Sequence, residues 1–488
     1  MSSVGHHLAR VLLVLLIVFV ARLPFISAGF GSDPDTWRVA VTAVRLHDTG
    51  DYSPSRFPGY PIQEYVTALF IRQGIVVVNL LSVLMSLLAT VCFVGILVHI
   101  KHRDPYIAAL AFAFTPVVYI ASTSAIDYIW ALAFVLLSWL MALYQKPLFS
   151  GIALGLAIGT RITSAMFSVP LLVLIYKKNK FIKNLFYFIV PCIAIPIAAF
   201  YPLYQKYGLD FLTYAHTQER LLIAIAQATM GVFGVVGTLG IALILAWRFL
   251  YWIKRQNLAA EEGALAEKPP ALLVVSIYIA IVLTIFSYLR LPVEAGYLVP
   301  LVPFILIAFS LVLSRKQFRL LCAFLIISPF VVGIPSPLEA TLVKPTTAAI
   351  PLPMPRIGAL QSLWLDPLQG PVLLDYQRRQ RTNAIMRAAI EIVPTLPQDS
   401  VILCYGVYWG VLYYNDGKFA EDKFTKENKK SEVTRLIQSG RPVYSLPWVR
   451  ECILWEFGYD IYSLGVVPLN LNTENLPQGA TRSSHTTP

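Results

Sequence analysis

The sequence predicts a multi-pass α-helical membrane protein of about 11 spans with a small C-terminal α/β domain outside the membrane. Of its 488 residues, 57% are hydrophobic and only 14% are charged, whereas about a quarter of a soluble chain is charged. Most of the first 335 residues lie in long apolar runs. From residue 336 onward these runs stop, and strand patterns alternate with helical ones.

The span count comes from apolar runs that are long enough to cross a bilayer or to pack within a bundle. They lie at about residues 8–30, 74–100, 105–122, 125–144, 148–160, 163–176, 185–204, 222–247, 271–288, 296–313 and 318–334. The first run has Arg10 near its start and small residues near its end, a pattern that also fits a cleaved signal peptide. We expect an uncleaved anchor.

The stretch 148–176 decides the orientation of everything that follows it. One long helix would place the lysines at 177–183 and all later basic loops outside the membrane. Two short helices that meet near Gly159-Thr160-Arg161 keep these lysines inside. We therefore expect two helices here. The protein would lie in the inner (plasma) membrane, with its N-terminus in the cytoplasm and its C-terminal region on the outer side. The net charge of +12 then indicates topology rather than nucleic-acid binding.

The cysteines fall into two groups. Cys92, Cys192 and Cys322 lie in apolar runs, where a thiol behaves as a small hydrophobic group. Cys404 and Cys452 lie in the C-terminal region, where an oxidising compartment would allow one disulfide between them. Spacing alone does not decide whether they are close, so their pairing stays open.

The densest group of charged residues follows the first run, in an outer loop placed at residues 31–73. Asp33-Pro34-Asp35-Thr36-Trp37-Arg38 opens this loop, and the spacing of apolar residues from 35 to 46 predicts an amphipathic helix at the membrane surface. A carboxylate at such a surface is partly desolvated, which raises its pKa and suits it to general-base catalysis. Asp35 has an alternative role as the N-cap of this helix.

This loop resembles the first outer loop of GT-C glycosyltransferases. The resemblance rests on Arg22-Leu23-Pro24, Asp35-x-x-Arg38, Gly50-Asp51-Tyr52 and the Pro-rich segment that follows. It is closest to members that use polyprenyl- or dolichyl-phosphate sugars, such as protein O-mannosyltransferases and the aminoarabinose transferases of lipid A. The resemblance implies an inverting enzyme that moves one sugar from a polyprenyl-phosphate donor to an acceptor hydroxyl on the outer face, with Asp35 as the base.

Two details of the resemblance leave choices open. Asp33-Pro34-Asp35 also resembles the Asp-x-Asp of some GT-C mannosyltransferases, so Asp33 is a second candidate for the base. Where the family often has Asp-Glu, this chain has Asp35-Thr36, and Phe57-Pro58-Gly59-Tyr60-Pro61 replaces a Lys-Pro-Pro type segment. The second departure leaves the class of acceptor open between protein, lipid A, polysaccharide and another glycolipid.

A departing lipid phosphate needs cations, and four outer arginines are candidates: Arg56, Arg161, Arg220 and Arg290. Arg161 interrupts an apolar region, where an arginine is costly unless it is paired. Its alternative role is a structural salt bridge to an acidic residue such as Asp127. The segment from Arg290 to Pro300 resembles the phosphate-pocket segments of the superfamily, with Arg290 as an anion clamp and Tyr297 as a neutral donor.

Other polar residues of the outer segments complete the predicted substrate site. His216 and Arg220 fall at helical spacing in the second outer loop, where a solvated face is the alternative. The full set of predicted substrate and phosphate contacts comprises Arg38, Asp51, Arg56, Tyr60, Arg161, His216, Arg220, Arg290 and Tyr297. No metal or other cofactor is expected, because a lipid monophosphate can depart with the help of arginine alone.

Two other functions compete with the enzyme. A flippase or transporter of a lipid-linked sugar would also use buried arginines, but transporters place polar residues near the midplane of an internal repeat. Here the acids gather at the outer boundary and no repeat is found. A non-catalytic scaffold would make Asp35 dispensable.

The predicted domains are a GT-C-like transmembrane domain at 1–335, an outer α/β domain at 336–471 and a disordered tail at 472–488. In the outer domain, the residue pattern predicts helices at 380–392 and 432–439. It predicts strands at 400–405, 442–446 and 459–464. The aromatic stretch 405–410 would suit sugar stacking, although packing is the simpler role.

Overall fold

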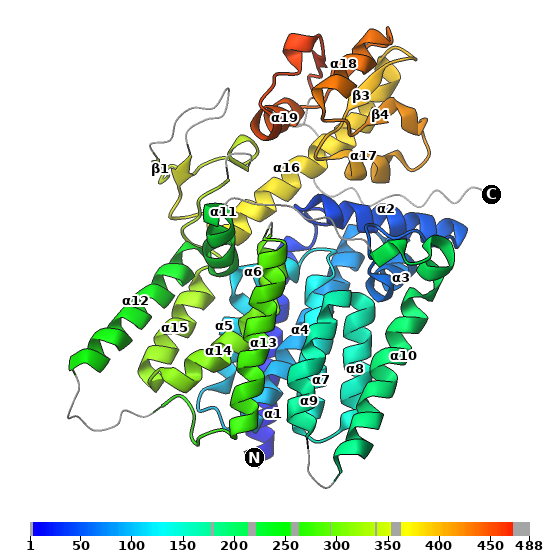
Figure 1. Ribbon diagram of the computed structural model, residues 1–488. Coiled ribbons are helices and arrows are strands. Elements are labelled where there is room, and N and C mark those ends of the chain that lie inside the picture. The colour runs from blue at the N-terminus through cyan, green and yellow to red at the C-terminus, as the bar shows by residue number, and fades with distance from the viewer. Residues whose placement is uncertain are drawn as a thin grey trace.

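The computed structural model in Figure 1 describes residues 3–176, 180–212, 221–254, 263–292, 294–336, 339–352 and 363–471. The predicted tail at 472–488 lies outside these residues. The helices of the first 335 residues stand side by side as a bundle, and the C-terminal strands and helices lie above one end of it (Figure 1).

All eleven apolar runs contain helices, as predicted. Among the residues that the structure describes, five helical segments are long and apolar enough to cross a membrane: Gly5–Phe25, Ile75–His99, Phe181–Tyr207, Leu221–Leu250 and Ala271–Arg290. They correspond to α1 (Ser3–Arg22), α4 (Ile75–His99), α10 (Phe181–Tyr207), α11 with α12 (Leu221–Ala226, Val232–Lys254) and α13 (Ala271–Arg290). The chain is a multi-pass membrane protein.

The remaining runs form shorter helices. They are α5 (Pro105–Phe114), α6 (Pro116–Ala121), α7 (Tyr128–Leu143), α8 (Pro147–Thr160), α9 (Ser168–Ile175), α14 (Leu301–Val312) and α15 (Arg315–Ile327). Pro116 explains why the run at 105–122 is divided, because the residue before a proline is disfavoured in a helix. Thr115 indeed has an extended backbone, with φ −56° and ψ 127°.

The predicted division of 148–176 is confirmed. α8 ends at Thr160, Arg161 is extended with φ −152° and ψ 111°, and a 3-10 helix at Ile162–Phe167 leads into α9. The break interrupts the helical hydrogen bonds at the one charged residue of the stretch.

α8 packs closely on α10 through three glycines spaced one turn apart: Gly151, Gly155 and Gly159. A Cβ at Gly151 would lie 2.2 Å from the carbonyl oxygen of Phe188, and one at Gly155 would lie 2.7 Å from that of Pro191. Small residues at this spacing let two helix backbones approach, which is the main way helices associate in lipid.

α2 (Pro34–Thr49) and α3 (Pro61–Phe70) form the first outer loop, and α2 lies across the end of the bundle (Figure 1). α2 is the predicted amphipathic helix. Its buried face includes Trp37, whose ring meets those of Phe30 and Tyr413 at 5.1 and 5.9 Å between centroids. α2 is therefore covered by the C-terminal region. Gly50 ends α2 with φ 70°, a conformation that favours glycine.

The C-terminal region contains a four-stranded parallel sheet with strand order β4-β3-β5-β6. The strands are β3 (Val401–Leu403), β4 (Phe424–Thr425), β5 (Val443–Ser445) and β6 (Val467–Pro468). The helices are α16 (Pro371–Ile392), α17 (Tyr408–Asn415), α18 (Lys430–Gln438) and α19 (Val449–Phe457). A two-stranded antiparallel pair, β1 (Ile350–Pro351) with β2 (Trp364–Leu365), lies apart from this sheet.

One expectation for this region is wrong. The strand predicted at 459–464 is a turn followed by a 3-10 helix at Tyr462–Leu464, because Asp460 accepts a hydrogen bond from the Tyr462 backbone N–H and pairs with Arg450. The edge strand β6 comes three residues later. The sequence left open whether Cys404 and Cys452 pair, and in the structure both are buried free thiols.

Two buried arginines fix the segment between α6 and α7, and Arg379 also joins the C-terminal region to the bundle. Arg22, at the end of α1, donates to Ser122 Oγ and to the carbonyl oxygen of Ala113, each at 2.7 Å. Arg379 of α16 donates to the carbonyl oxygen of Thr123 at 2.8 Å and pairs with Asp375. Both arginines therefore bind the short segment between α6 and α7.

The packing of α8 on α10 predicts that Gly151→Ala destabilises the protein. Alanine favours a helix over glycine, but here its Cβ meets a backbone carbonyl oxygen that cannot turn away. The expected cost is about 1–3 kcal/mol of folding free energy, measured as a lower Tm of the detergent-solubilised protein. Gly263→Ala is the control, because its Cβ has no neighbour nearer than 3.8 Å. An unchanged Tm for Gly151→Ala would contradict the close approach.

Candidate active site

The carboxylates of Asp33 and Asp35 lie at the N-terminus of α2, shortly after the first span. Asp33 is the N-cap, and its Oδ1 accepts a hydrogen bond from the Asp35 backbone N–H at 2.8 Å. Pro34 at the first helical position favours this helix start. The capping role considered for Asp35 therefore belongs to Asp33, which leaves the Asp35 carboxylate for other contacts.

Asp35 forms ion pairs with two arginines. Arg38, one turn further along α2, lies 3.2 Å from Oδ1, and Arg56 contacts Oδ2. Arg56 also lies 3.2 Å from Asp127, which pairs with Arg161 at 2.5 Å. Asp35, Arg56, Asp127 and Arg161 thus form a row of alternating charges, here named the charge chain. Asp127 is only 1% exposed.

Arg161 enters the charge chain from the break between α8 and the 3-10 helix. Its guanidinium lies 4.5 Å from the ring centroid of Tyr128, 5.0 Å from that of Tyr297 and 5.8 Å from that of Tyr60. Aromatic faces attract a cation most strongly where water is scarce. The salt bridge to Asp127 that the sequence offered as an alternative exists, and Tyr297 lies beside it.

The loop that carries Arg56 is held by a buried carboxylate of α3. Glu64 accepts hydrogen bonds from the backbone N–H groups of Ser55 at 2.9 Å and Tyr60 at 3.3 Å, and from the Tyr52 hydroxyl. Arg56 Nε in turn donates to the Tyr60 hydroxyl at 2.7 Å. These bonds fix the loop so that Arg56 faces both Asp35 and Asp127.

A cavity of about 320 Å³ opens beside the start of α2. Asp33 and Glu294 line it together with Tyr128, whose hydroxyl donates to Glu294 at 2.8 Å. Apolar side chains of α6 form part of the opposite wall. A space with an apolar wall and a few convergent polar groups is typical of a small-molecule site.

Two carboxyl groups at the start of α2, those of Asp33 and Asp35, have raised pKa values. Burial, together with the neighbouring Glu294, raises the pKa of Asp33 to about 7. Burial also raises the pKa of Asp35, although Arg56 and Arg38 oppose the shift. Both groups therefore exchange a proton at a higher pH than an ordinary aspartate, which suits a general base.

The carboxylate oxygens of Asp33, Asp35 and Glu294 lie within 4.8 Å of one another, and such a group has ligands that a divalent cation accepts. Arg38 and Arg56 already balance the charge of Asp35, and Asp33 is used in capping the helix.

Some predicted site residues lie elsewhere. Asp51 pairs with Arg45 and with Lys206, each at 2.7 Å, and these contacts tie the loop to α10 at the surface. Arg290 is exposed at the end of α13. His216 and Arg220 lie outside the described residues. The structure thus brings together Asp33, Asp35, Arg38, Arg56, Tyr60, Arg161 and Tyr297.

Three further members of the site were not singled out from the sequence for a substrate role. Asp127 was considered only as a structural partner of Arg161, yet it joins both arginines of the charge chain. Tyr128 of α7 and Glu294, which lies before α14, both line the cavity beside the start of α2. A carboxylate directly beside an outer span end is the one sequence signal that could have pointed to Glu294.

Comparison with known proteins gives a match in fold only. No family model and no curated protein matches the chain. Among solved structures, the chain is similar to ArnT from Cupriavidus metallidurans bound to undecaprenyl phosphate, with a TM-score of 0.51 and 12% sequence identity. That match covers 94% of this chain and 92% of that chain. ArnT in the apo state matches with a TM-score of 0.49 and 13% identity, over 93% and 95% of the two chains.

The match extends over nearly the whole of both chains, which includes the span bundle and the C-terminal region. At this identity it establishes the architecture and leaves the chemistry to be argued from the site. The chain therefore shares the fold of ArnT.

Proposed function

We propose that this protein is an inverting glycosyltransferase that moves a single sugar from a polyprenyl-phosphate donor to an acceptor hydroxyl on the outer face of the plasma membrane. The charge chain is the observation that carries the proposal, because it gathers two arginines and a candidate base at the mouth of the bundle. The solved structure of similar fold was obtained with undecaprenyl phosphate bound.

The arginines are suited to the phosphate of the donor. Arg56 contacts two carboxylates, Asp35 and Asp127, so an incoming phosphate competes with these groups for its guanidinium. Guanidinium groups bind phosphate in a bidentate manner and stabilise the charge that develops as it departs. When Arg56 turns to the phosphate, Asp35 loses one of its two ion pairs and becomes a better proton acceptor.

The transfer step then follows from these positions. The acceptor oxygen attacks the anomeric carbon as the bond from that carbon to the phosphate oxygen breaks, and the acceptor proton passes to Asp35. The phosphate leaves with the bonding electrons, and Arg56 and Arg161 compensate its charge. Because attack and departure occur on opposite faces, the anomeric configuration is inverted. Arginine meets the electrostatic need, so we propose that no divalent cation is required.

Asp33 is the second candidate for the base, and one observation favours it. Asp33 lines the cavity directly and shares it with Glu294, whereas the Asp35 oxygens face arginines. In either case the acceptor hydroxyl lies in or beside this cavity. The two assignments differ in what substitution and pH do to the rate.

Substitution of the base is the first test. Asp35→Asn removes the proton acceptor with little change in shape, and we expect the transfer rate to fall by about 10²–10⁴-fold. The measurement is transfer of radiolabelled sugar from a panel of undecaprenyl-phosphate donors in membranes that contain equal amounts of each variant. Asp48→Asn, on the exposed last turn of the same helix, is the matched control.

The outcomes separate the competing functions. Loss of transfer in Asp33→Asn with full activity in Asp35→Asn would make Asp33 the base. Absence of transfer by wild type across the panel, together with movement of the donor across vesicles, would replace the enzyme by a flippase. Equal activity in the presence of EDTA is expected, and its loss on chelation would contradict the metal-free proposal.

The phosphate site has a separate prediction that does not depend on the sugar. Arg56→Lys keeps the charge but removes the bidentate fork, so undecaprenyl phosphate is expected to bind about tenfold more weakly. Binding is measured by native mass spectrometry of the purified protein. Arg45→Lys, an exposed arginine of α2, serves as the control. Equal binding by Arg56→Lys and wild type would remove Arg56 from the phosphate site.

The raised pKa values predict the pH dependence of transfer. A general base acts only when it is deprotonated, so the rate is expected to fall as the pH drops through the raised pKa of that base. If Asp35 is the base, Asp33→Asn moves this acid limb to lower pH, because the negative charge of Asp33 is one cause of the raised pKa of Asp35. If the pH–rate profile of an active Asp33→Asn variant falls at the same acidic pH as that of wild type, the charge of Asp33 does not affect the pKa of Asp35.

A further inference from the structure

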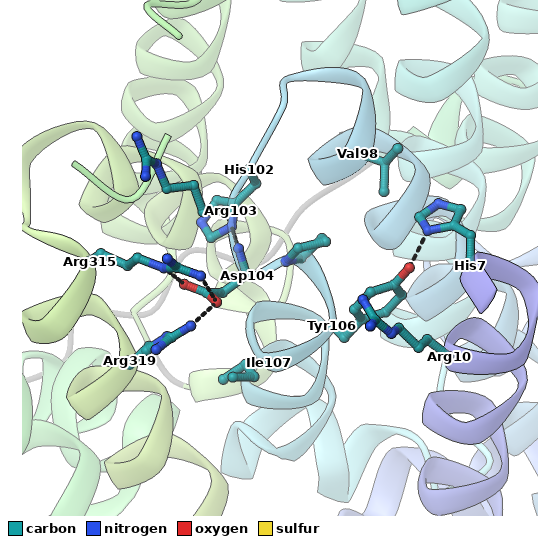
Figure 2. Close-up of a pocket in the computed structure, with 11 residues that line it drawn as sticks. His7, Arg10, Val98, His102, Arg103, Asp104, Tyr106, Ile107, Arg315 and Arg319 are labelled. Carbon is teal, nitrogen blue, oxygen red and sulfur yellow. Dashed lines mark hydrogen bonds and ion pairs between the residues drawn. The ribbon is translucent and has the colours of Figure 1, made fainter. Parts of the chain in front are cut away.

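A second cavity, of about 520 Å³, lies at the other end of the bundle from the charge chain. It forms where the first turns of α1, the loop between α4 and α5, and the first turns of α15 meet, as Figure 2 shows. In Figure 1 the N-terminus of α1 lies at the lower end of the bundle, and α2 lies at the upper end. The proposed transfer reaction does not use this cavity.

Arginines dominate the wall of this cavity. Arg10, Arg103, Arg315 and Arg319 line it, and Asp104 is the one carboxylate among the described residues that do so. Asp104 accepts hydrogen bonds from Arg315 at 2.8 and 3.0 Å and from Arg319 at 2.6 Å. Burial opposes ionisation of Asp104, but these bonds outweigh it and lower its pKa to about 2. One ionised carboxylate leaves the wall strongly positive.

Arg10 faces Asp104 and its partners from the opposite side of the cavity (Figure 2). Its guanidinium lies 5.8 Å from the ring centroid of Tyr106, whose hydroxyl is hydrogen-bonded to His7. Arg10 is exposed and forms no ion pair with any residue that the structure describes. Positive groups from α1 and α15 therefore approach the same space from two sides.

A buried donor without an acceptor lies in the same wall. His102 is 5% exposed, and its Nδ1 accepts a hydrogen bond from the Asp104 backbone N–H at 3.0 Å. Burial lowers the pKa of His102 to about 4, so the ring is neutral and its proton is on Nε2. Nε2 has no partner among the described residues. Because a buried unpaired donor is costly, an acceptor that reaches Nε2 would be stabilising.

The cavity borders the apolar outer surface of the bundle. Ile107 lines it and is 37% exposed, and Leu8 and Leu12 of α1 are 59% and 56% exposed. Leu320 of α15 is 42% exposed on the other side. In a membrane-spanning bundle such side chains face acyl chains, so a ligand seated here has a polar part among arginines and an apolar part along the helices.

We propose that this cavity binds the phosphate group of an anionic phospholipid, whose acyl chains lie along α1, α5 and α15. Arg10 and Arg319 contact the phosphate oxygens, and His102 supplies a neutral donor from the wall. The site lies where the sequence places the cytoplasmic leaflet. It is independent of the proposed transfer reaction, because its residues belong to the other end of the bundle.

The test compares three probes on the purified full-length protein: dioleoyl phosphatidylglycerol, dioleoyl phosphatidylcholine and inorganic phosphate. We expect phosphatidylglycerol to bind, as measured by native mass spectrometry, and to raise the Tm, whereas phosphatidylcholine and inorganic phosphate have little effect. Arg10→Gln and Arg319→Gln are each expected to weaken phosphatidylglycerol binding about fivefold, the effect of one basic residue at a membrane surface.

Lys316→Gln is the matched control, because Lys316 is exposed on the same turn of α15 and does not line the cavity. Arg10→Gln leaves the Asp104 ion pairs in place, so it separates ligand binding from folding. Equal binding of the two lipids, equal effects of Lys316→Gln and Arg319→Gln, or saturation by inorganic phosphate would each overturn the proposal. Transfer activity measured in the same variants tests the proposed function separately.

Discussion

The alternating charges of Asp35, Arg56, Asp127 and Arg161 are the interaction on which this structure depends. A lone charge at this depth is expensive, and removal of one partner from a buried pair leaves the other uncompensated. The four side chains come from α2, from the loop before α3, from the start of α7 and from the break after α8. Their pairing therefore requires that four separate segments meet at one place.

The helix breaks and the close packing of the bundle bring these four segments together. Arg161 reaches Asp127 because α8 stops at Thr160, and α8 is held near α10 by glycines that let the backbones approach. Asp127 reaches both arginines because α7 begins at the next residue. An apolar bundle thus carries a short row of paired charges at one end.

Much of this architecture could be predicted from local sequence patterns. The apolar runs, the amphipathic helix after Asp33 and the break at Arg161 each depend on residues close together in the chain. The bridge from Arg56 to Asp127 spans 71 positions, and Glu294 lies still further along, so no local pattern reports them. The segment 459–464 has the composition of a strand, but the tertiary contact of Asp460 with Arg450 makes it a turn.

Gly50-Asp51 illustrates the same limit within the site itself. Its distance from Asp35 matches the family resemblance, yet Gly50 ends a helix and Asp51 binds surface cations. The spacing therefore reflects the length of α2, a property of the fold. Residues that end a helix and residues that take part in catalysis can occur at the same spacing in a sequence. Their contacts in the structure distinguish the two roles.

The contact of Arg379 with the carbonyl oxygen of Thr123 joins the C-terminal helix α16 to the segment that leads into Asp127. Only four positions separate that carbonyl from the carboxylate that holds both arginines. The contact therefore ties the position of α16 to the segment that carries Asp127, which pairs with both Arg56 and Arg161. The outer region thus holds the segment that carries Asp127 as well as covering α2.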